Sequence, residues 1–175
     1  MEEILILCIG DSKLIGDSLG PLIGSFLERN KSDIGNNVKV LGTLEKPIGY
    51  NDLIEIAKHI PADASHLTIT GGEPFMVGPD IFRFFEFLRE KFECTDFLLL
   101  TNGRIFAVDS YVERFVEKAP KNSIVAIPIH GSTANIHDMI TQSKGSFNQT
   151  KIGIKKLLKA GIHVELRIVV SRLNK

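Results

Sequence analysis

The feature that most constrains the fold is a regular alternation of short apolar runs with segments of helical periodicity along the whole chain. The apolar runs are EILILCI, VKVLGT, HLTIT, DFLLLT, SIVAIPI and HVELRIVV, which begin at residues 3, 38, 66, 96, 123 and 163. Most are apolar throughout, as expected for strands that helices cover on both faces. The alternation predicts an α/β fold of about six mostly parallel strands, either an open doubly wound sheet or a partial β/α barrel.

Length and composition bound the organisation and the partners. A chain of 175 residues suits a single α/β domain. Lysine and arginine together number 21, as do aspartate and glutamate, so no net charge draws the chain to nucleic acid or to an anionic membrane. No apolar run approaches the roughly 18 residues of a membrane span, and the start MEE lacks the basic region of a secretory signal. With two cysteines and no C-x-x-C pair, we expect a cytoplasmic protein that binds small molecules or neutral protein surfaces.

The unusual residues follow the predicted strands. Right-handed crossovers bring the carboxyl end of every parallel strand, and the loop after it, to one edge of the sheet, where α/β proteins bind ligands. In the first of these loops, GDSKLIGDSLGP, Asp17 either caps the helix that starts near Pro21 or acts as a metal ligand or an acid or base. The loop is neither a P-loop nor a G-x-G-x-x-G dinucleotide loop, because the required spacings are missing.

Residues 4–53, with GDSLGPL followed by GTLEKP, resemble the YyaC-type sporulation proteins, which are related in fold to hydrogenase maturation endopeptidases. In those peptidases an acidic residue at the place of Asp17 binds a metal, together with an Asp after a later strand and a His. The resemblance therefore implies a divalent metal and a catalytic role for Asp17. The later strand ends in TITGG here, without the second acidic ligand.

The third loop, in TITGGEP, carries a second candidate site. Gly71 and Gly72 allow the backbone to approach a ligand closely, Glu73 offers a carboxylate and Pro74 restricts the turn. This combination suits an ammonium group, which has several donors and favours a charged acceptor. The alternative is a tight turn with a solvated glutamate.

Residues 62–173 resemble radical SAM enzymes, most closely the maturases of the His-Xaa-Ser peptide systems. The segments that carry the resemblance are ADASHLTITGGEP, FLLLTNGRIFA, IPIHGSTANIHDMI and GSFNQTKIGIKKLLKAGIHVELRIVVSR. The resemblance implies S-adenosylmethionine (SAM) as a cofactor and a peptide as the kind of substrate. It implies that residues 71–74 contact the amino group of SAM, and that Asn102, His130 and Arg167 lie near the cofactor.

The cysteine content conflicts with radical SAM chemistry. The [4Fe–4S] cluster of that family needs three thiolates from one CxxxCxxC loop, and this chain has only Cys8 and Cys94. We therefore expect no cluster from this chain. The leading interpretation is a composite, YyaC-like over residues 1–60 and radical SAM-like over 61–175, that binds SAM and has lost catalysis or depends on a partner for it. The alternatives are a metal-dependent peptidase acting through Asp17 and a non-catalytic scaffold.

Overall fold

The computed structural model describes residues 4–9, 38–41 and 49–175, with side chains from Gly49 onward. The chain divides into two compact units. The first consists of Met1–Leu100 with Lys118–Ser123, and the second of Thr101–Glu117 with Ile124–Lys175. These two units are defined by how the chain packs. The join expected near residue 60 is a different boundary, between segments that resemble two families, and it stays a prediction.

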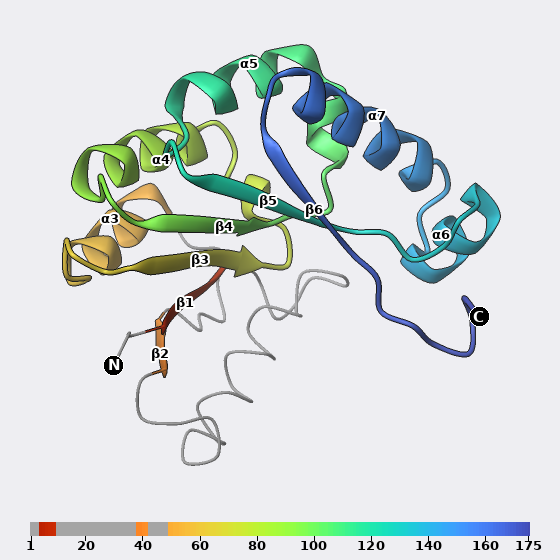
Figure 1. Cartoon of the computed structure of the whole chain (residues 1–175), viewed down its shortest axis with the longest axis horizontal. Coiled ribbons are helices and arrows are strands. Elements are labelled where there is room, and N and C mark those ends of the chain that lie inside the picture. Colours follow the sequence, from red (N-terminus) through yellow and green to blue (C-terminus); the bar gives the residue numbers. More distant parts are fainter. Residues whose placement is uncertain (1–3, 10–37, 42–48) are drawn as a thin grey trace. The chain divides into compact units, whose positions relative to one another are not determined.

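All six predicted strands are present, and every strand pair within a unit is parallel. In the first unit the strand order is β2-β1-β3-β4, and in the second β5 pairs with β6 (Figure 1). The bounds are Ile4–Ile9 (β1), Val38–Leu41 (β2), His66–Gly71 (β3), Asp96–Leu100 (β4), Ser123–Pro128 (β5) and His163–Arg167 (β6). The predicted α/β class, with parallel strands alternating with helices, is confirmed.

The order of the first unit places β1 between β2 and β3, and Ile9 at the end of β1 is paired with Gly71. A barrel wound consecutively would instead pair β2 with β3. The next strand after β1 in the chain, β2, lies on one side of it, whereas the next strand after β3, β4, lies on the other side of β3, so the strand order reverses between β1 and β3. The boundary between β1 and β3 is therefore a topological switch point, the place where open α/β sheets leave a crevice at the carboxyl ends of their strands.

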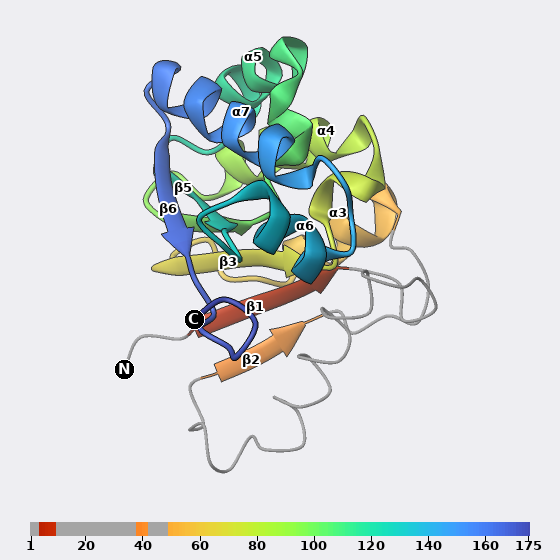
Figure 2. The same ribbon diagram turned by 90° about the vertical axis from the view of Figure 1, so that its right-hand side faces the viewer.

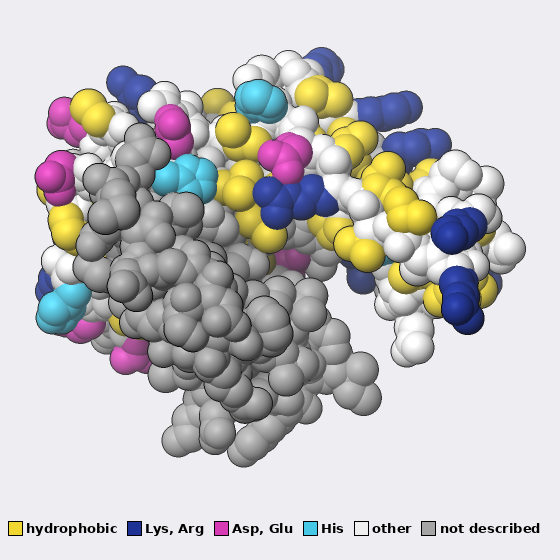
Figure 3. Space-filling model, turned by 60° about the horizontal axis from the view of Figure 1, so that its bottom comes forward, with side chains coloured by type: hydrophobic (Ala, Val, Ile, Leu, Met, Phe, Trp, Pro, Cys, Tyr) yellow, Lys and Arg dark blue, Asp and Glu magenta, His cyan; other side chains and the backbone are white. Residues whose placement is uncertain are grey.

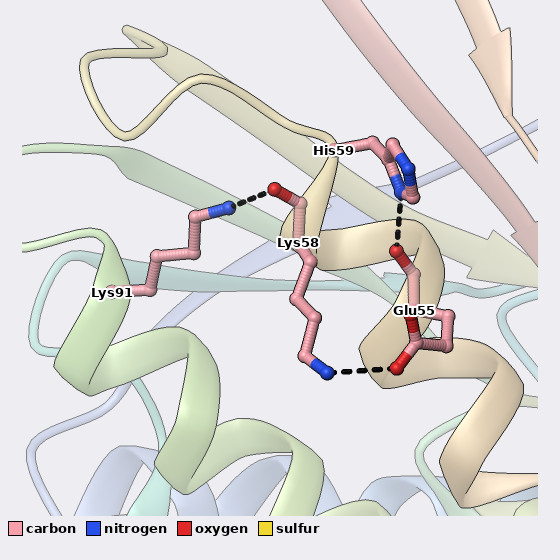
Figure 4. Close-up of polar contacts among 4 residues, drawn as sticks. All are labelled: Glu55, Lys58, His59 and Lys91. Atoms are coloured by element: carbon pink, nitrogen blue, oxygen red, sulfur yellow. Dashed lines mark hydrogen bonds and ion pairs between the residues drawn. The ribbon is translucent and has the colours of Figure 1, made fainter.

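Two helices of the first unit, α3 (Tyr50–Lys58) and α4 (Asp80–Lys91), lie side by side (Figures 1 and 2). The end of α3 is satisfied from α4, because the Lys91 ammonium donates to the main-chain oxygens of Ala57 at 2.7 Å and Lys58 at 2.8 Å. Figure 4 shows the second of these bonds beside the exposed ion pair of Lys58 with Glu55. Burial lowers the pKa of Lys91. Lys91 therefore acts as a tertiary cap for the last turn of α3.

The first unit is centred on phenylalanines of α4. Phe84, Phe85 and Leu88 belong to an apolar stripe that recurs at helical spacing along α4, and all three are buried. Phe82 lies off this stripe but is only 2% exposed, because its ring packs at 6.1 Å from Phe75 in the 3₁₀ helix η1 (Pro74–Val77). The loop after β3 is thus part of the core.

The second unit also contains a 3₁₀ helix and three α-helices, arranged around β5 and β6 (Figure 2). They are η2 (Arg104–Ala107), α5 (Asp109–Lys118, whose last residue belongs to the first unit), α6 (Ala134–Thr141) and α7 (Ser146–Lys159). Phe106 and Phe115 stack edge to face at 5.3 Å in its core. Gly161 follows α7 with φ of +79°, the left-handed conformation in which a glycine ends a helix.

The helix α7 starts at Ser146, where a side chain from α6 caps its first turn. The Asp138 carboxylate accepts from the main-chain N–H of Gly145 at 2.6 Å and of Phe147 at 2.8 Å, and from the Ser146 hydroxyl at 3.0 Å. The bonds from Phe147 and Gly145 hold the pKa of Asp138 below its usual value. This carboxylate satisfies first-turn donors of α7 from outside the helix.

The strand predicted to run to Val170 ends at Arg167. Ile168, Val169 and Val170 beyond it are 64%, 69% and 69% exposed, and they pair with no described strand. Figure 3 shows hydrophobic side chains in yellow beside basic ones in dark blue over the face in view. Within the described part of the chain, no helix has both the length and the apolar character needed to cross a membrane.

Candidate functional site

The loop after β3 holds the four residues 71–74 predicted to contact SAM. Glu73 caps the 3₁₀ helix η1, and its Oε1 accepts from the Phe75 main-chain N–H at 3.3 Å. Gly71, Gly72 and Glu73 are half-buried, whereas Pro74 is buried at the first position of η1. A carboxylate has about four lone-pair sites, so the bond to Phe75 is compatible with an ammonium donor at the same group.

Aromatic packing holds this loop in place. The ring of Phe75 lies 6.1 Å from the rings of both Phe82 and Phe85, which are themselves 6.2 Å apart. Phe75 is 7% exposed and the other two are 2% and 1% exposed. Because Phe75 follows Glu73 by two residues, this three-ring cluster fixes the backbone that carries the carboxylate. The loop lies at the switch point between β1 and β3.

A second loop, residues 101–104, carries Asn102 in the second unit. The Asn102 side-chain oxygen accepts from the Arg104 N–H at 2.9 Å, and the Thr101 hydroxyl accepts from the Gly103 N–H at 3.2 Å. Gly103 has φ of +72°, in the left-handed region, and a Cβ there would come within 2.8 Å of Ile127. Asn102 is therefore half-buried in a tightly turned loop beside β5.

His130 and Arg167 lie next to each other at the carboxyl ends of β5 and β6. The N–H of Ile129 donates to the Arg167 carbonyl at 2.8 Å, and the Arg167 guanidinium donates to Glu165 at 2.6 Å. The His130 N–H donates to Nδ1 of His137 at 3.2 Å, which places the His137 proton on Nε2. His137 is 2% exposed, and burial lowers its pKa. The second unit thus brings Asn102, His130 and Arg167 to one edge.

Sequence reasoning missed the residues of α7 that touch the Asn102 loop. The Thr150 hydroxyl donates to the Asn102 carbonyl at 3.0 Å, and a Cβ on Gly153 would lie 2.2 Å from the Gly103 carbonyl oxygen. The sequence signal that could have indicated this contact is Gly153, a glycine inside a helical segment three residues after Thr150, because such a glycine often marks close packing.

The structure also bears on the expected metal and cluster ligands. Asp17 lies outside the described residues. Residues 49–175 and the two short strands contain no group of three His, Cys, Asp or Glu side chains placed to hold a metal. Cys94 is exposed between α4 and the start of β4, at the strand's amino end. Two cysteines do not supply the three thiolates of a [4Fe–4S] cluster, so the residues do not fit that group.

Comparison with known proteins gives two family matches. Residues 1–70 match a family described as proteins of unknown function, DUF1256, and residues 44–174 match the radical SAM superfamily. The composite character expected from the sequence is confirmed by these two overlapping matches.

A curated relative and solved structures agree with the second match. The antilisterial bacteriocin subtilosin biosynthesis protein AlbA of Bacillus subtilis is 32% identical over 106 residues, which are 61% of this chain and 22% of AlbA. Two structures of anSMEcpe with bound AdoMet, one with a histidine tag and one native with the Kp18Cys peptide, have TM-scores of 0.62 and 0.57 at 16% and 14% identity. Each alignment covers 95% of this chain and 43% of the chain in the solved structure, so this chain spans less than half the length of these proteins. At identities this low, the likeness is one of fold. The radical SAM match runs from residue 44 to residue 174 and so covers three quarters of the 175-residue chain. The chain therefore belongs to the radical SAM superfamily.

Proposed function

We propose that this chain binds SAM at the loop after β3, with the Glu73 carboxylate accepting from the methionyl ammonium. The observation that carries the proposal is the placement of this carboxylate. It lies at the β1–β3 switch point, on a loop that Phe75 anchors in the core. The main-chain carbonyls of Gly71 and Gly72 are neutral acceptors on the same loop, and Pro74 occupies the first position of η1. A charged acceptor flanked by carbonyls suits a primary ammonium.

Three residues of the second unit are the remaining candidates for cofactor contact. Asn102 offers a side-chain amide, and His130 an imidazole. Arg167 offers a guanidinium that already donates to Glu165, so it would contact SAM while still paired with that carboxylate. In radical SAM enzymes the cofactor supplies a carbon radical after one-electron reduction by the cluster. Without three thiolates, this chain would bind SAM but would not cleave it reductively alone, so a peptide substrate would be modified only with a cluster-bearing partner.

Calorimetric titration of SAM into the purified protein tests this proposal. We expect saturable binding to one site per chain, and at least tenfold weaker binding by Glu73→Ala, because the ammonium loses its charged partner. Glu93→Ala is the matched control, since Glu93 is an exposed carboxylate just after the end of α4. Absence of binding by the wild type, or equal binding by Glu73→Ala, would refute the proposal.

Iron analysis after anaerobic reconstitution tests the cluster separately. We expect far fewer than the roughly four irons per chain that a cluster requires. About four irons per chain, together with SAM cleavage by the protein alone, would contradict the proposed loss of the cluster.

The second candidate is a metal-dependent peptidase acting through Asp17, and the DUF1256 match over residues 1–70 favours it. It predicts one bound zinc or nickel ion that is lost in Asp17→Ala. Thermal unfolding that responds to neither SAM nor divalent metals would support a non-catalytic scaffold instead, because a ligand that binds only the folded state raises the midpoint.

A further inference from the structure

We infer that α7 positions the cofactor loop, with Thr150 as the positioning residue that holds Asn102 in the orientation required for SAM. This inference rests on the proposed function. It assigns a role to a helix whose sequence alone indicates only an amphipathic segment.

The bond from Thr150 constrains the peptide that follows Asn102. The Thr150 side chain is 1% exposed, and its hydroxyl donates to the Asn102 carbonyl at 3.0 Å. Fixing this carbonyl fixes the peptide plane between Asn102 and Gly103, which sets the direction of the loop. A half-buried carbonyl that loses its donor carries a desolvation penalty, so the backbone would rotate to find another donor.

The Asn102 side chain is oriented by the same loop. The Arg104 N–H can only donate, so the atom that accepts from it at 2.9 Å is the amide oxygen, and the amide nitrogen of Asn102 faces the other way. The nitrogen is a donor, which matches an acceptor oxygen of the cofactor. A change in the loop that broke the bond from the Arg104 N–H would therefore release the amide and the direction of this donor.

Further contacts from α7 hold both sides of the loop. The Arg104 guanidinium donates to Gln149 on α7 at 2.7 Å and to Ser143 just before the helix at 3.1 Å. One turn after Thr150, Gly153 allows α7 to approach the Gly103 carbonyl so closely that a Cβ would lie 2.2 Å from it. Near the other end of α7, Lys156 donates to the Ala107 carbonyl at 2.7 Å. The helix is thus held against the entire segment from Asn102 to Ala107.

The test compares Thr150→Val, which keeps the shape and removes the hydroxyl, with Thr150→Ser, which keeps the hydroxyl. We expect SAM binding about tenfold weaker in Thr150→Val and within about twofold of wild type in Thr150→Ser, the size of effect that follows from losing one ligand-positioning hydrogen bond. Asn148→Ala, an exposed change on the same helix, is the control and leaves binding unchanged.

Amide hydrogen exchange in the ligand-free protein supplies a readout that does not depend on SAM. We expect faster exchange at Gly103 and Arg104 in Thr150→Val, with exchange in β5 unchanged. Equal SAM affinity of Thr150→Val and the wild type, with binding still lost in Glu73→Ala, would overturn the role of Thr150 and leave the proposed function standing. No SAM binding by the wild type would overturn the proposed function and, with it, the cofactor role of Thr150.

Discussion

Replacing Gly153 with alanine tests whether the close approach of α7 to the Asn102 loop is real. Alanine is better than glycine inside a helix by about 1 kcal/mol, so a helix with open space at this position would become more stable. In this structure the new Cβ would lie 2.2 Å from the Gly103 carbonyl oxygen and 3.2 Å from Cβ of Phe106. The first of these atoms belongs to the backbone and cannot rotate away.

Relief of this contact requires α7 and the loop to separate by close to an ångström, and overpacking of this kind costs about 1–3 kcal/mol or more. Since the gain in helix propensity is about 1 kcal/mol, we expect a net loss of roughly 1–2 kcal/mol, or a fall of about 2–8 °C in the thermal midpoint for a chain of this size. Circular dichroism with thermal and urea unfolding measures it, and Asn148→Ala serves as the exposed control. A Gly153→Ala variant as stable as the wild type would refute the packing argument.

Two other features give direct predictions. Lys91→Met should reduce the free energy of unfolding by about 1 kcal/mol, because the Lys58 carbonyl at the end of α3 loses its Lys91 donor and the Ala57 carbonyl keeps only main-chain donors such as the Ile60 N–H at 3.2 Å. Lys58→Met loses only an exposed ion pair and should change the free energy of unfolding by less than about 0.5 kcal/mol, and equal urea midpoints for the two variants would contradict this. The pKa values of His137 and Asp138 in the folded protein both lie below the ordinary values of 6.5 and 3.8. Each group therefore stabilises the fold at a pH above its ordinary pKa, and this stabilisation is lost as the pH falls through the pKa of the folded state. Urea titrations from pH 7 to pH 3 should show falling stability, with a shallower fall near pH 6 in His137→Asn and below pH 4 in Asp138→Asn; unchanged slopes in both variants would refute it.

Most of the regular structure could be predicted from the sequence, because buried parallel strands and amphipathic helices have strong patterns. The glycine stop at Gly161 follows from the same local rules. Features that depend on tertiary contacts are not encoded by local patterns. Phe82 is buried by a ring from the preceding loop, and the first turn of α7 is capped by Asp138 from another helix.

The candidate site was predicted only in part. Residues 71–74 lie on a half-buried loop after β3 as expected for a ligand loop, whereas their roles toward SAM stay predictions. The pairing of β1 with β3 depends on strand order, which local periodicity does not encode. The contact between Thr150 and Asn102 joins residues 48 apart in the sequence, so no local pattern reports it.

The ladder between β1 and β3 bears on how proteins of mixed ancestry arise by recombination. Six consecutive residues of β1, from Ile4 to Ile9, are in register with residues 66–71 of β3. The strand β1 lies where only the DUF1256 family matches, whereas residues 66–70 of β3 lie where the DUF1256 and radical SAM matches overlap. A parallel ladder is formed by main-chain groups, which every residue except proline provides in full. A strand inherited from one family can therefore serve as the neighbour of a strand inherited from another. Joining two α/β genes between complete strand–helix units can then preserve the edge of the sheet at which α/β proteins bind their ligands.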